Sequence, residues 1–220
     1  MLPALVIAGF AACILLFFWI GHEVGEDEFR AFDGAILLAL RDPADLSRPL
    51  GPHWLPETAA EITALGGYPL IFLLVLVVVG FLVAARLSGV ALFVALSILS
   101  GWAVSHGLKS LYARPRPDVV PQLDIVHTAS FPSGHATMTT LVYLTLAAVI
   151  ASLTASLRIR IYVFAVAILI SVSVGLSRVY LGVHWPSDVA AGWALGAAWA
   201  ALSWLAAAAL RRWRAMRTGG

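Results

Sequence analysis

Phe131-Pro132-Ser133-Gly134-His135 directly precedes a long apolar run that begins at Ala136. The run continues to Leu157 without a charged residue, which is long enough for a helix to cross the ~30 Å of a membrane's hydrocarbon. A Ser-Gly-His triplet at the start of a helix combines free backbone N–H groups, a hydroxyl and an imidazole, and such a helix start is suited to bind an anion. The stretch therefore predicts a membrane-spanning helix with a polar site at its first turn.

The composition also indicates a membrane protein. Of the 220 residues, 61% are hydrophobic and 12% are charged, whereas a soluble domain averages about 45–50% apolar and about 25% charged residues. The net charge of +2 is small and the basic residues are scattered or flank apolar runs, so we expect no nucleic-acid partner. The single cysteine, Cys13, excludes an internal disulfide and a multi-cysteine metal site.

Six stretches are apolar enough, and nearly all long enough, to cross a membrane as helices. Only helices or closed barrels span a bilayer, and no alternating ten-residue pattern points to a barrel. The six stretches are Leu2–Ile20, Tyr68–Ala85, Gly89–Leu108, Ala136–Leu157, Ile161–Leu176 and Val189–Leu210. The fifth is the shortest and is expected to extend into its flanks. We predict an all-α fold, a single polytopic membrane domain over residues 1–220 with six transmembrane helices.

The distribution of charge predicts the orientation. We expect the first run to remain an uncleaved span, because no Lys or Arg precedes it and it ends in bulky Phe17, Phe18 and Trp19. With the N-terminus inside, the inside connections and the tail hold seven basic residues and no acidic one, whereas the outside segments hold the other seven basic and all twelve acidic residues. Short cytoplasmic loops collect Lys and Arg. We therefore expect a plasma (inner) membrane protein with both termini cytoplasmic and residues 132–135 on the extracytoplasmic (periplasmic) face.

The first outside segment, His22–Gly67, contains two amphipathic patterns. Apolar residues recur at helical spacing in Glu26–Arg41 and again in Trp54–Leu65, which predicts two short helices along the membrane surface. Prolines between positions 43 and 56 separate and bound them. The segment could serve as a packing lid over the helix ends or as one wall of a lipid access path.

Three polar clusters lie at the outer ends of the predicted spans: residues 109–117, 132–135 and 177–188. Each of Lys109, Arg116 and Arg178 alone would suit a charged anchor that reaches from a span to the membrane surface. The topology, however, brings all three to the same side and depth as the anion-ready helix start. Because the arginine fork donates two parallel hydrogen bonds to phosphate, the convergence predicts a phosphate site.

The histidines divide into two groups. His184 and Asp188 are four residues apart, so they share one helix face if Pro186 lies in the first turn of the sixth span. The carboxylate can then hold one imidazole nitrogen as a donor and leave the other as a nucleophile; a purely structural His–Asp pair is the alternative. His135 can donate a proton near neutral pH. We expect the other histidines to be solvated or packed: His22, His53, His106 and His127.

No pattern of metal ligands accompanies these clusters. The sequence has no His-x-x-x-His pair, no paired acidic ligands among the clusters and no cysteine cluster. The cationic side chains would take the place of Mg²⁺. We therefore expect chemistry that needs neither a metal nor a cofactor.

The spacing within the three clusters is specific, and it resembles the type 2 phosphatidic acid phosphatase (PAP2) superfamily. That family's pattern is Lys, six residues, Arg-Pro; then Pro-Ser-Gly-His; then Ser-Arg, five residues, His, three residues, Asp. Every specified position matches here: Lys109, Arg116-Pro117, Pro132-Ser133-Gly134-His135, Ser177-Arg178, His184 and Asp188. The match covers residues 109–188, and the six-span layout extends the likeness to most of the chain.

The resemblance implies a role for each matched residue. His184 would be a nucleophile that forms a phosphohistidine, Asp188 would orient it, and His135 would protonate the leaving oxygen before water releases phosphate. Five groups would hold the phosphate oxygens: Lys109, Arg116, Ser133, the Gly134 N–H and Arg178. Fixed donors of this kind lower the barrier to phosphoryl transfer because charge spreads over the equatorial oxygens.

The expected function is metal-independent hydrolysis of a membrane lipid's phosphate or diphosphate. Undecaprenyl diphosphate, phosphatidylglycerophosphate and phosphatidate are the expected substrate types, and the bilayer is the expected environment. A lipid phosphotransferase that passes the phosphoryl group to a lipid or sugar acceptor is one alternative. A non-catalytic lipid binder or transporter is another, against which the intact histidines argue. The oligomeric state is not readable, and Gly192 and Gly196 only hint at a helix contact.

Overall fold

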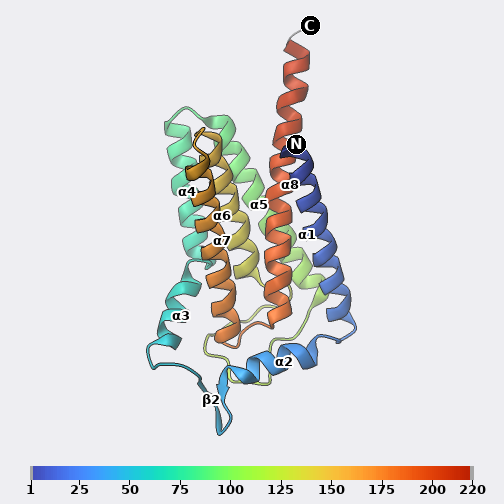
Figure 1. The fold of residues 1–220 in the computed structure, drawn as a ribbon, viewed down its shortest axis with the longest axis vertical. Coiled ribbons are helices and arrows are strands. Elements are labelled where there is room, and N and C mark those ends of the chain that lie inside the picture. Colours follow the sequence, from blue (N-terminus) through green and yellow to red (C-terminus); the bar gives the residue numbers. More distant parts are fainter. Residues whose placement is uncertain (1, 219–220) are drawn as a thin grey trace.

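The computed structural model describes residues 2–218, and most of these are helical. The long helices run side by side as one bundle, and the short elements gather at one end of it (Figure 1). In chain order the elements are α1 (Leu2–Gly25), α2 (Arg30–Ala39), β1 (Arg41–Asp42), β2 (Asp45–Pro49), α3 (Leu55–Ala64), α4 (Tyr68–Ala84), α5 (Ser88–Tyr112), α6 (Gly134–Ser152), α7 (Leu157–Tyr180) and α8 (Pro186–Thr218).

The prediction of six transmembrane helices is confirmed, with one qualification in shape. Among the described residues, α1, α5, α6, α7 and α8 are each long and apolar enough to cross a membrane. The 17-residue α4 reaches that length together with α3, to which it is joined at a bend of 41°. Gly66 lies in this bend, and a Cβ there would stand 2.6 Å from Cγ1 of Val174. The bend therefore needs a residue without a side chain.

The helices differ from the predicted spans mainly at their ends. α7 takes residues from both flanks of the predicted fifth span, as expected. α6 begins at Gly134, where the hydroxyl oxygen of Ser133 accepts the Ala136 N–H at 3.5 Å as an N-cap. α8 begins at Pro186, whose fixed φ suits a first helical position. Two of the three polar clusters therefore lie at helix starts.

The central helix of the bundle is α6, which contacts α4, α5, α7 and α8. Met138, Leu141 and Val142 in its middle are fully buried. Because lipid tails are as apolar as these side chains, close packing through small residues decides how the helices associate. On α8, a Cβ at Gly192 would stand 2.9 Å from the Ser133 carbonyl oxygen, and one at Gly196 would stand 2.8 Å from Cβ of Thr140. The glycine pair is therefore a contact with α6 inside the chain.

The segment between α1 and α4 lies at the end of the bundle opposite to the start of α1 and the end of α8 (Figure 1). Both predicted amphipathic helices form there, as α2 and α3, and α3 packs against α7. Between them β1 pairs with β2 in an antiparallel hairpin that was not predicted, with Arg41 opposite Pro49. Pro49 closes the short strand, a position at a sheet edge that tolerates the missing N–H.

Candidate active site

The three polar clusters meet at the end of the bundle that carries α2 and α3 (Figure 1). They lie on the last turn of α5 and the loop after it, at the start of α6, and on the last turn of α7 together with the turn that leads into α8. A backbone hydrogen bond joins the starts of the last two helices, because the Ser133 N–H donates to the carbonyl oxygen of Asp188 at 3.0 Å. The helix ends thus hold the polar side chains of distant segments side by side.

His184 lies in the turn between α7 and α8 and is only 1% exposed. Its Nδ1 lies 3.3 Å from Oδ2 of Asp188. Asp188 occupies the first turn of α8 because the helix begins at Pro186, so the four-residue spacing places both side chains on one face as predicted. The Trp185 N–H donates to the same carboxylate oxygen at 2.9 Å, which fixes its position.

Arg116 defines which nitrogen of His184 carries the proton. Its Nη1 lies 3.3 Å from Nε2 of His184 and also donates to the Val183 carbonyl oxygen. A guanidinium has no acceptor, so Nε2 must be the acceptor and Nδ1–H the donor to the carboxylate. This tautomer leaves the lone pair of Nε2 directed toward a cation. Nε of Arg116 donates to the Thr128 carbonyl oxygen at 2.8 Å, which holds the fork in place.

The other two predicted cations are buried in the same region. Nζ of Lys109 donates to the Ala129 carbonyl oxygen at 2.6 Å. Nη1 of Arg178 donates to Oδ2 of Asp124 at 2.7 Å and to the Thr63 hydroxyl at 3.1 Å. Nε and Nη2 of Arg178 are buried and have no partner. Because an unpaired buried donor is costly, these two N–H groups suit an anion that arrives from outside the protein.

The first turn of α6 is closely packed against Tyr68 and Lys109. A Cβ on Gly134 would collide with the hydroxyl of Tyr68 and would stand 3.4 Å from Cε of Lys109. Glycine at this position leaves room for the hydroxyl of Tyr68. The ring of His135 lies 6.3 Å from the ring of Tyr68, centroid to centroid. Ser133 is fully buried, and its hydroxyl caps the helix.

The positive charges of the polar clusters act on the imidazole of His184. Burial lowers the pKa of this imidazole well below 6.5, and the positive charges of Arg116, Lys109 and Arg178 lower it further. Burial and then the charge of Arg178 lower the pKa of Arg116 to about 10, so this guanidinium remains charged at neutral pH. Among residues 2–218, no three His, Cys, Asp or Glu side chains group as metal ligands would. Metal-free chemistry stays a prediction.

A network around Asp188 was not predicted from the sequence. Nη1 of Arg114 lies 2.6 Å from Oδ1 of Asp188, and Nη2 lies 3.0 Å from Oδ2 of Asp33 on α2. The hydroxyl of Ser130 donates to the other oxygen of Asp188, and Ser187 donates its N–H to Asp33 at 2.9 Å. One guanidinium thus connects the carboxylate beside His184 with a second buried carboxylate.

The sequence contained a signal for this network. Asp33 lies four residues after Phe29 and four before Leu37, so a carboxylate interrupts the apolar stripe of the predicted surface helix. In the structure this face turns inward, where Asp33 and Leu37 are both fully buried. Burial raises the pKa of Asp33, and the hydrogen bonds from Ser187 and Arg114 act in the opposite direction. A buried charge of this kind needs a partner, which Arg114 supplies.

Two further histidines lie next to the site. His106 and His127 line a hollow of about 540 Å³ together with Lys109 and Arg116. His106 stacks on Trp102, with ring centroids 5.3 Å apart. Both side chains are exposed, as expected of solvated histidines, and both lie beside two of the cations that were predicted to hold phosphate.

The site and the fold can now be compared with known proteins. The sequence profile of the PAP2 superfamily matches residues 90–212, which include all three polar clusters. The chain belongs to the PAP2 superfamily. Among PAP2 relatives, phosphatidylglycerophosphatase B of Bacillus subtilis is 34% identical over 146 residues, which make up 65% of this chain and 70% of that protein. The decaprenylphosphoryl-5-phosphoribose phosphatase of Mycobacterium tuberculosis is 38% identical over 98 residues, 43% of this chain, and the match spans about half of that protein (49%).

Solved PAP2 structures share the fold. The crystal structure of a transmembrane PAP2-type phosphatidylglycerolphosphate phosphatase from Bacillus subtilis superimposes with a TM-score of 0.77 at 28% identity, covering 88% of this chain and 93% of that one. The crystal structure of LpxE from Aquifex aeolicus gives a TM-score of 0.55, also at 28% identity, covering 70% of this chain and 87% of that one. The predicted membership of the PAP2 superfamily and the helical membrane fold are both confirmed.

Proposed function

We propose that this PAP2 protein is an integral-membrane phosphatase that removes a phosphate group from a membrane lipid through a phosphohistidine on His184. One observation carries the proposal. Nδ1 of the buried His184 faces the carboxylate of Asp188 at 3.3 Å, while Nε2 faces Nη1 of Arg116 at 3.3 Å. A neutral imidazole whose Nε2 carries a lone pair is arranged to attack the phosphorus of a bound phosphate once the guanidinium of Arg116 turns its N–H from Nε2 to the phosphate oxygens.

In the first step, Nε2 of His184 forms a bond to phosphorus as the bond from phosphorus to the lipid oxygen breaks. His135 gives its proton to that leaving oxygen. Asp188 stabilises the positive charge that develops on the imidazole because it accepts the Nδ1–H. Arg116, Lys109 and Arg178 hold the phosphate oxygens, with the unpaired Nε and Nη2 of Arg178 as the available donors.

In the second step, water attacks the phosphorus and the bond to Nε2 breaks. His135, now neutral, takes a proton from that water. Inorganic phosphate leaves and both histidines return to their starting states, so the cycle consumes only water. If an alcohol of another lipid or a sugar replaces water here, the same intermediate gives a phosphotransferase.

A phosphate monoester lipid is the substrate class that the comparisons favour. One relative is a phosphatidylglycerophosphatase, and the match spans 70% of its length. One solved structure is a phosphatidylglycerolphosphate phosphatase, and the superposition covers 93% of its chain. Phosphatidylglycerophosphate is therefore the first candidate. Undecaprenyl diphosphate and phosphatidate are the other two, and the mycobacterial relative supports testing polyprenyl lipids as well.

The decisive experiment is a phosphate-release panel on purified protein in detergent, with the three lipids as substrates. His184→Ala is expected to abolish release from every lipid that the wild type cleaves, and His135→Ala to reduce it by about 10²–10⁴. His53→Gln, at a histidine remote from the site, is the matched control and should release phosphate at the full rate. Wild-type activity in His184→Ala would refute the mechanism, and loss of activity with EDTA would refute the cation-only site.

A labelled lipid donor separates hydrolase from phosphotransferase. Release of the label as inorganic phosphate supports hydrolysis, whereas label in a second lipid or a sugar shows transfer. Binding of the lipid without release of label from the wild type would identify the non-catalytic alternative.

A further inference from the structure

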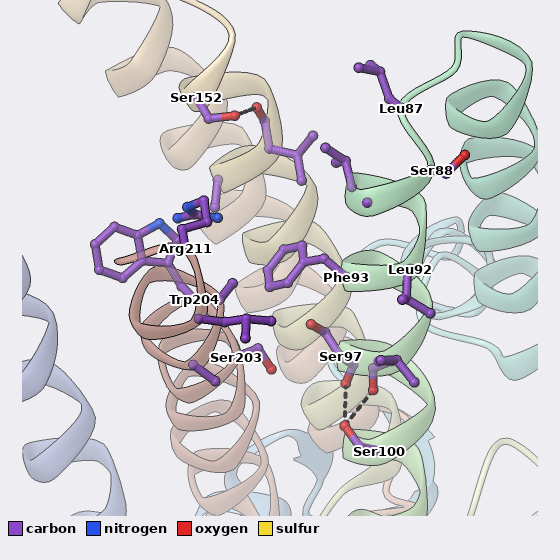
Figure 2. A pocket seen from close by; sticks show the side chains of 18 of the residues that line it. Leu87, Ser88, Leu92, Phe93, Ser97, Ser100, Ser152, Ser203, Trp204 and Arg211 are labelled. Atoms are coloured by element: carbon purple, nitrogen blue, oxygen red, sulfur yellow. Dashed lines mark hydrogen bonds between the residues drawn. The ribbon is translucent and has the colours of Figure 1, made fainter. Parts of the chain in front are cut away.

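A second hollow, of about 990 Å³, lies between α5, α6 and α8 (Figure 2). Its lining residues include the start of α5 and the end of α6, which lie at the end of the bundle opposite to α2 and α3 (Figure 1). Apolar side chains from all three helices line most of it, among them Leu92, Phe93, Leu96, Val149 and Trp204. Arg86 and Arg211 also line it, and no acidic side chain does. We call this hollow the α5–α8 groove. An apolar cavity of ~300–1,000 Å³ with a few convergent polar groups is the usual form of a ligand site.

The groove has two structural causes. α5 and α8 are in close contact near Gly101, and α8 carries small residues in the turns that follow this contact. At Gly101, a Cβ would stand 2.8 Å from Cδ1 of Trp199 on α8, so the helices touch there. Beyond this contact α8 presents Ala206 and Ala207 to the groove, which leave the space between the helices unfilled. The floor is closed by a hydrogen bond from the indole of Trp199 to the Ser100 hydroxyl at 3.0 Å.

The dimensions of the α5–α8 groove match one leaflet of a bilayer. On α5 its lining residues run from Ser88 to Ser100, and twelve residues of helix rise by about 18 Å. One leaflet contributes roughly 15 Å of hydrocarbon. Arg86 lies in the turn before α5, at the outer end of the groove, and Figure 2 shows Arg211 on α8 beside Trp204. The apolar lining residues of α5 continue from this end toward the middle of the bundle. A ligand that fits has a charged head and a long apolar tail.

The backbone at Arg86 adds an independent observation. Arg86 lies in the turn between α4 and α5 with φ of 60°, in the left-handed region that favours glycine. Glycine would form this turn without the steric cost that a side chain carries. An arginine at the position therefore points to a use for its side chain, and Arg86 is one of the residues that line the groove. Arginine donates paired hydrogen bonds to phosphate oxygens.

We propose that the α5–α8 groove binds an anionic phospholipid of the leaflet at that end, with its phosphate between Arg86 and Arg211 and an acyl chain along Leu92, Phe93 and Leu96. This site is separate from the proposed catalytic site, which lies at the other end of the bundle. It does not depend on the protein being a phosphatase.

The test is native mass spectrometry of the purified protein titrated with phosphatidylserine or, separately, with phosphatidylcholine of the same acyl chains. The variant Arg86→Gly/Arg211→Gln removes both charges, and its glycine relieves the left-handed backbone, so the fold is not weakened there. Its affinity for phosphatidylserine is expected to fall about twenty- to thirtyfold, because each basic residue near an anionic headgroup contributes roughly a fivefold factor. Arg158→Gln/Arg212→Gln is the matched control, since it removes two charges that do not line the groove.

Ala207→Phe fills the α5–α8 groove and keeps both arginines. It is expected to lose phosphatidylserine binding as well, which separates this site from lipid bound at the catalytic end. Equal loss in the control variant, equal affinity for phosphatidylcholine in the wild type, or full binding in Ala207→Phe would each overturn the proposal. A dimer that forms only when the groove is unfilled would assign the groove to a second copy of the chain and would overturn it too.

Discussion

Replacing Arg114 by methionine tests whether two buried carboxylates depend on one guanidinium. Arg114 is 8% exposed in its side chain, and both of its partners, Asp33 and Asp188, are 0% exposed. Removal of one partner from a buried ion pair typically costs about 3–5 kcal/mol, because the remaining charge stays buried and unpaired. Here two carboxylates lose their cation together, so we expect the upper part of that range.

The expected loss is a large share of the ~5–15 kcal/mol that stabilises an ordinary protein. For a chain of this size, each kcal/mol shifts the melting temperature by about 2–4 °C, so Arg114→Met should melt about 10–20 °C below the wild type. Thermal unfolding in detergent, followed by the fluorescence of the eight tryptophans, measures this shift. Phosphate release should fall as well at temperatures where the variant stays folded, since the proposed mechanism needs Asp188 to orient His184.

Arg30→Met is the matched control because it breaks an exposed ion pair. Arg30 lies 3.5 Å from Asp118, and the two side chains are 51% and 68% exposed. Such pairs contribute about 0–1 kcal/mol, so the melting temperature should change by a few degrees at most. Arg114→Lys should fall between the two, because an ammonium cannot bridge both carboxylates as a planar fork does. An Arg114→Met protein that melts no lower than Arg30→Met would refute the reasoning.

Two other predictions concern the imidazole and the orientation. Burial and then the charge of Arg116 lower the pKa of His184 well below 6.5, which favours the unprotonated Nε2 that the proposed mechanism needs. In Arg116→Gln the pKa should rise toward 6.5 and the acid limb of the residual rate should move to higher pH, which rate profiles over about pH 4–8 can measure; an unmoved limb would contradict the electrostatic account. We expect the C-terminus to be cytoplasmic, because the arginines of the tail follow the positive-inside rule. A reporter that works only in the cytoplasm should therefore be active when it is fused after the last residue. A reporter active on the other face would reverse the proposed orientation.

The parts of the fold that follow from local patterns could be predicted from the sequence. Apolar runs locate the spans because each must be continuous to cross hydrocarbon, and the helical spacing in residues 26–41 and 54–65 located α2 and α3. The relation of Pro186 to His184 and Asp188 also follows from local helix geometry. What could not be predicted is the 41° bend between α3 and α4, since it depends on the fit of Gly66 against α6 and α7.

The ion-pair network depends on partners that are far apart in the chain. Arg114 and Asp33 are 81 positions apart, and Arg114 and Asp188 are 74 apart. The spacing of the clusters predicts that Lys109 and Arg116 hold a phosphate. It does not predict that the neighbouring Arg114 pairs with carboxylates of the protein itself. Arg114 and Arg116 differ by two positions in a proline-bounded loop, and only the folded backbone shows that one points to carboxylates and the other to His184.

The link from Asp33 through Arg114 to Asp188 also limits how a lipid can reach the site. If α2 moved outward, the carboxylate of Asp33 would separate from the guanidinium of Arg114, and this buried ion pair would be broken. We therefore expect α2 to stay fixed beside the site. Any movement that admits a lipid has to come from other elements. A disulfide or a crosslink that ties α2 to the start of α8 should therefore leave the rate of phosphate release unchanged.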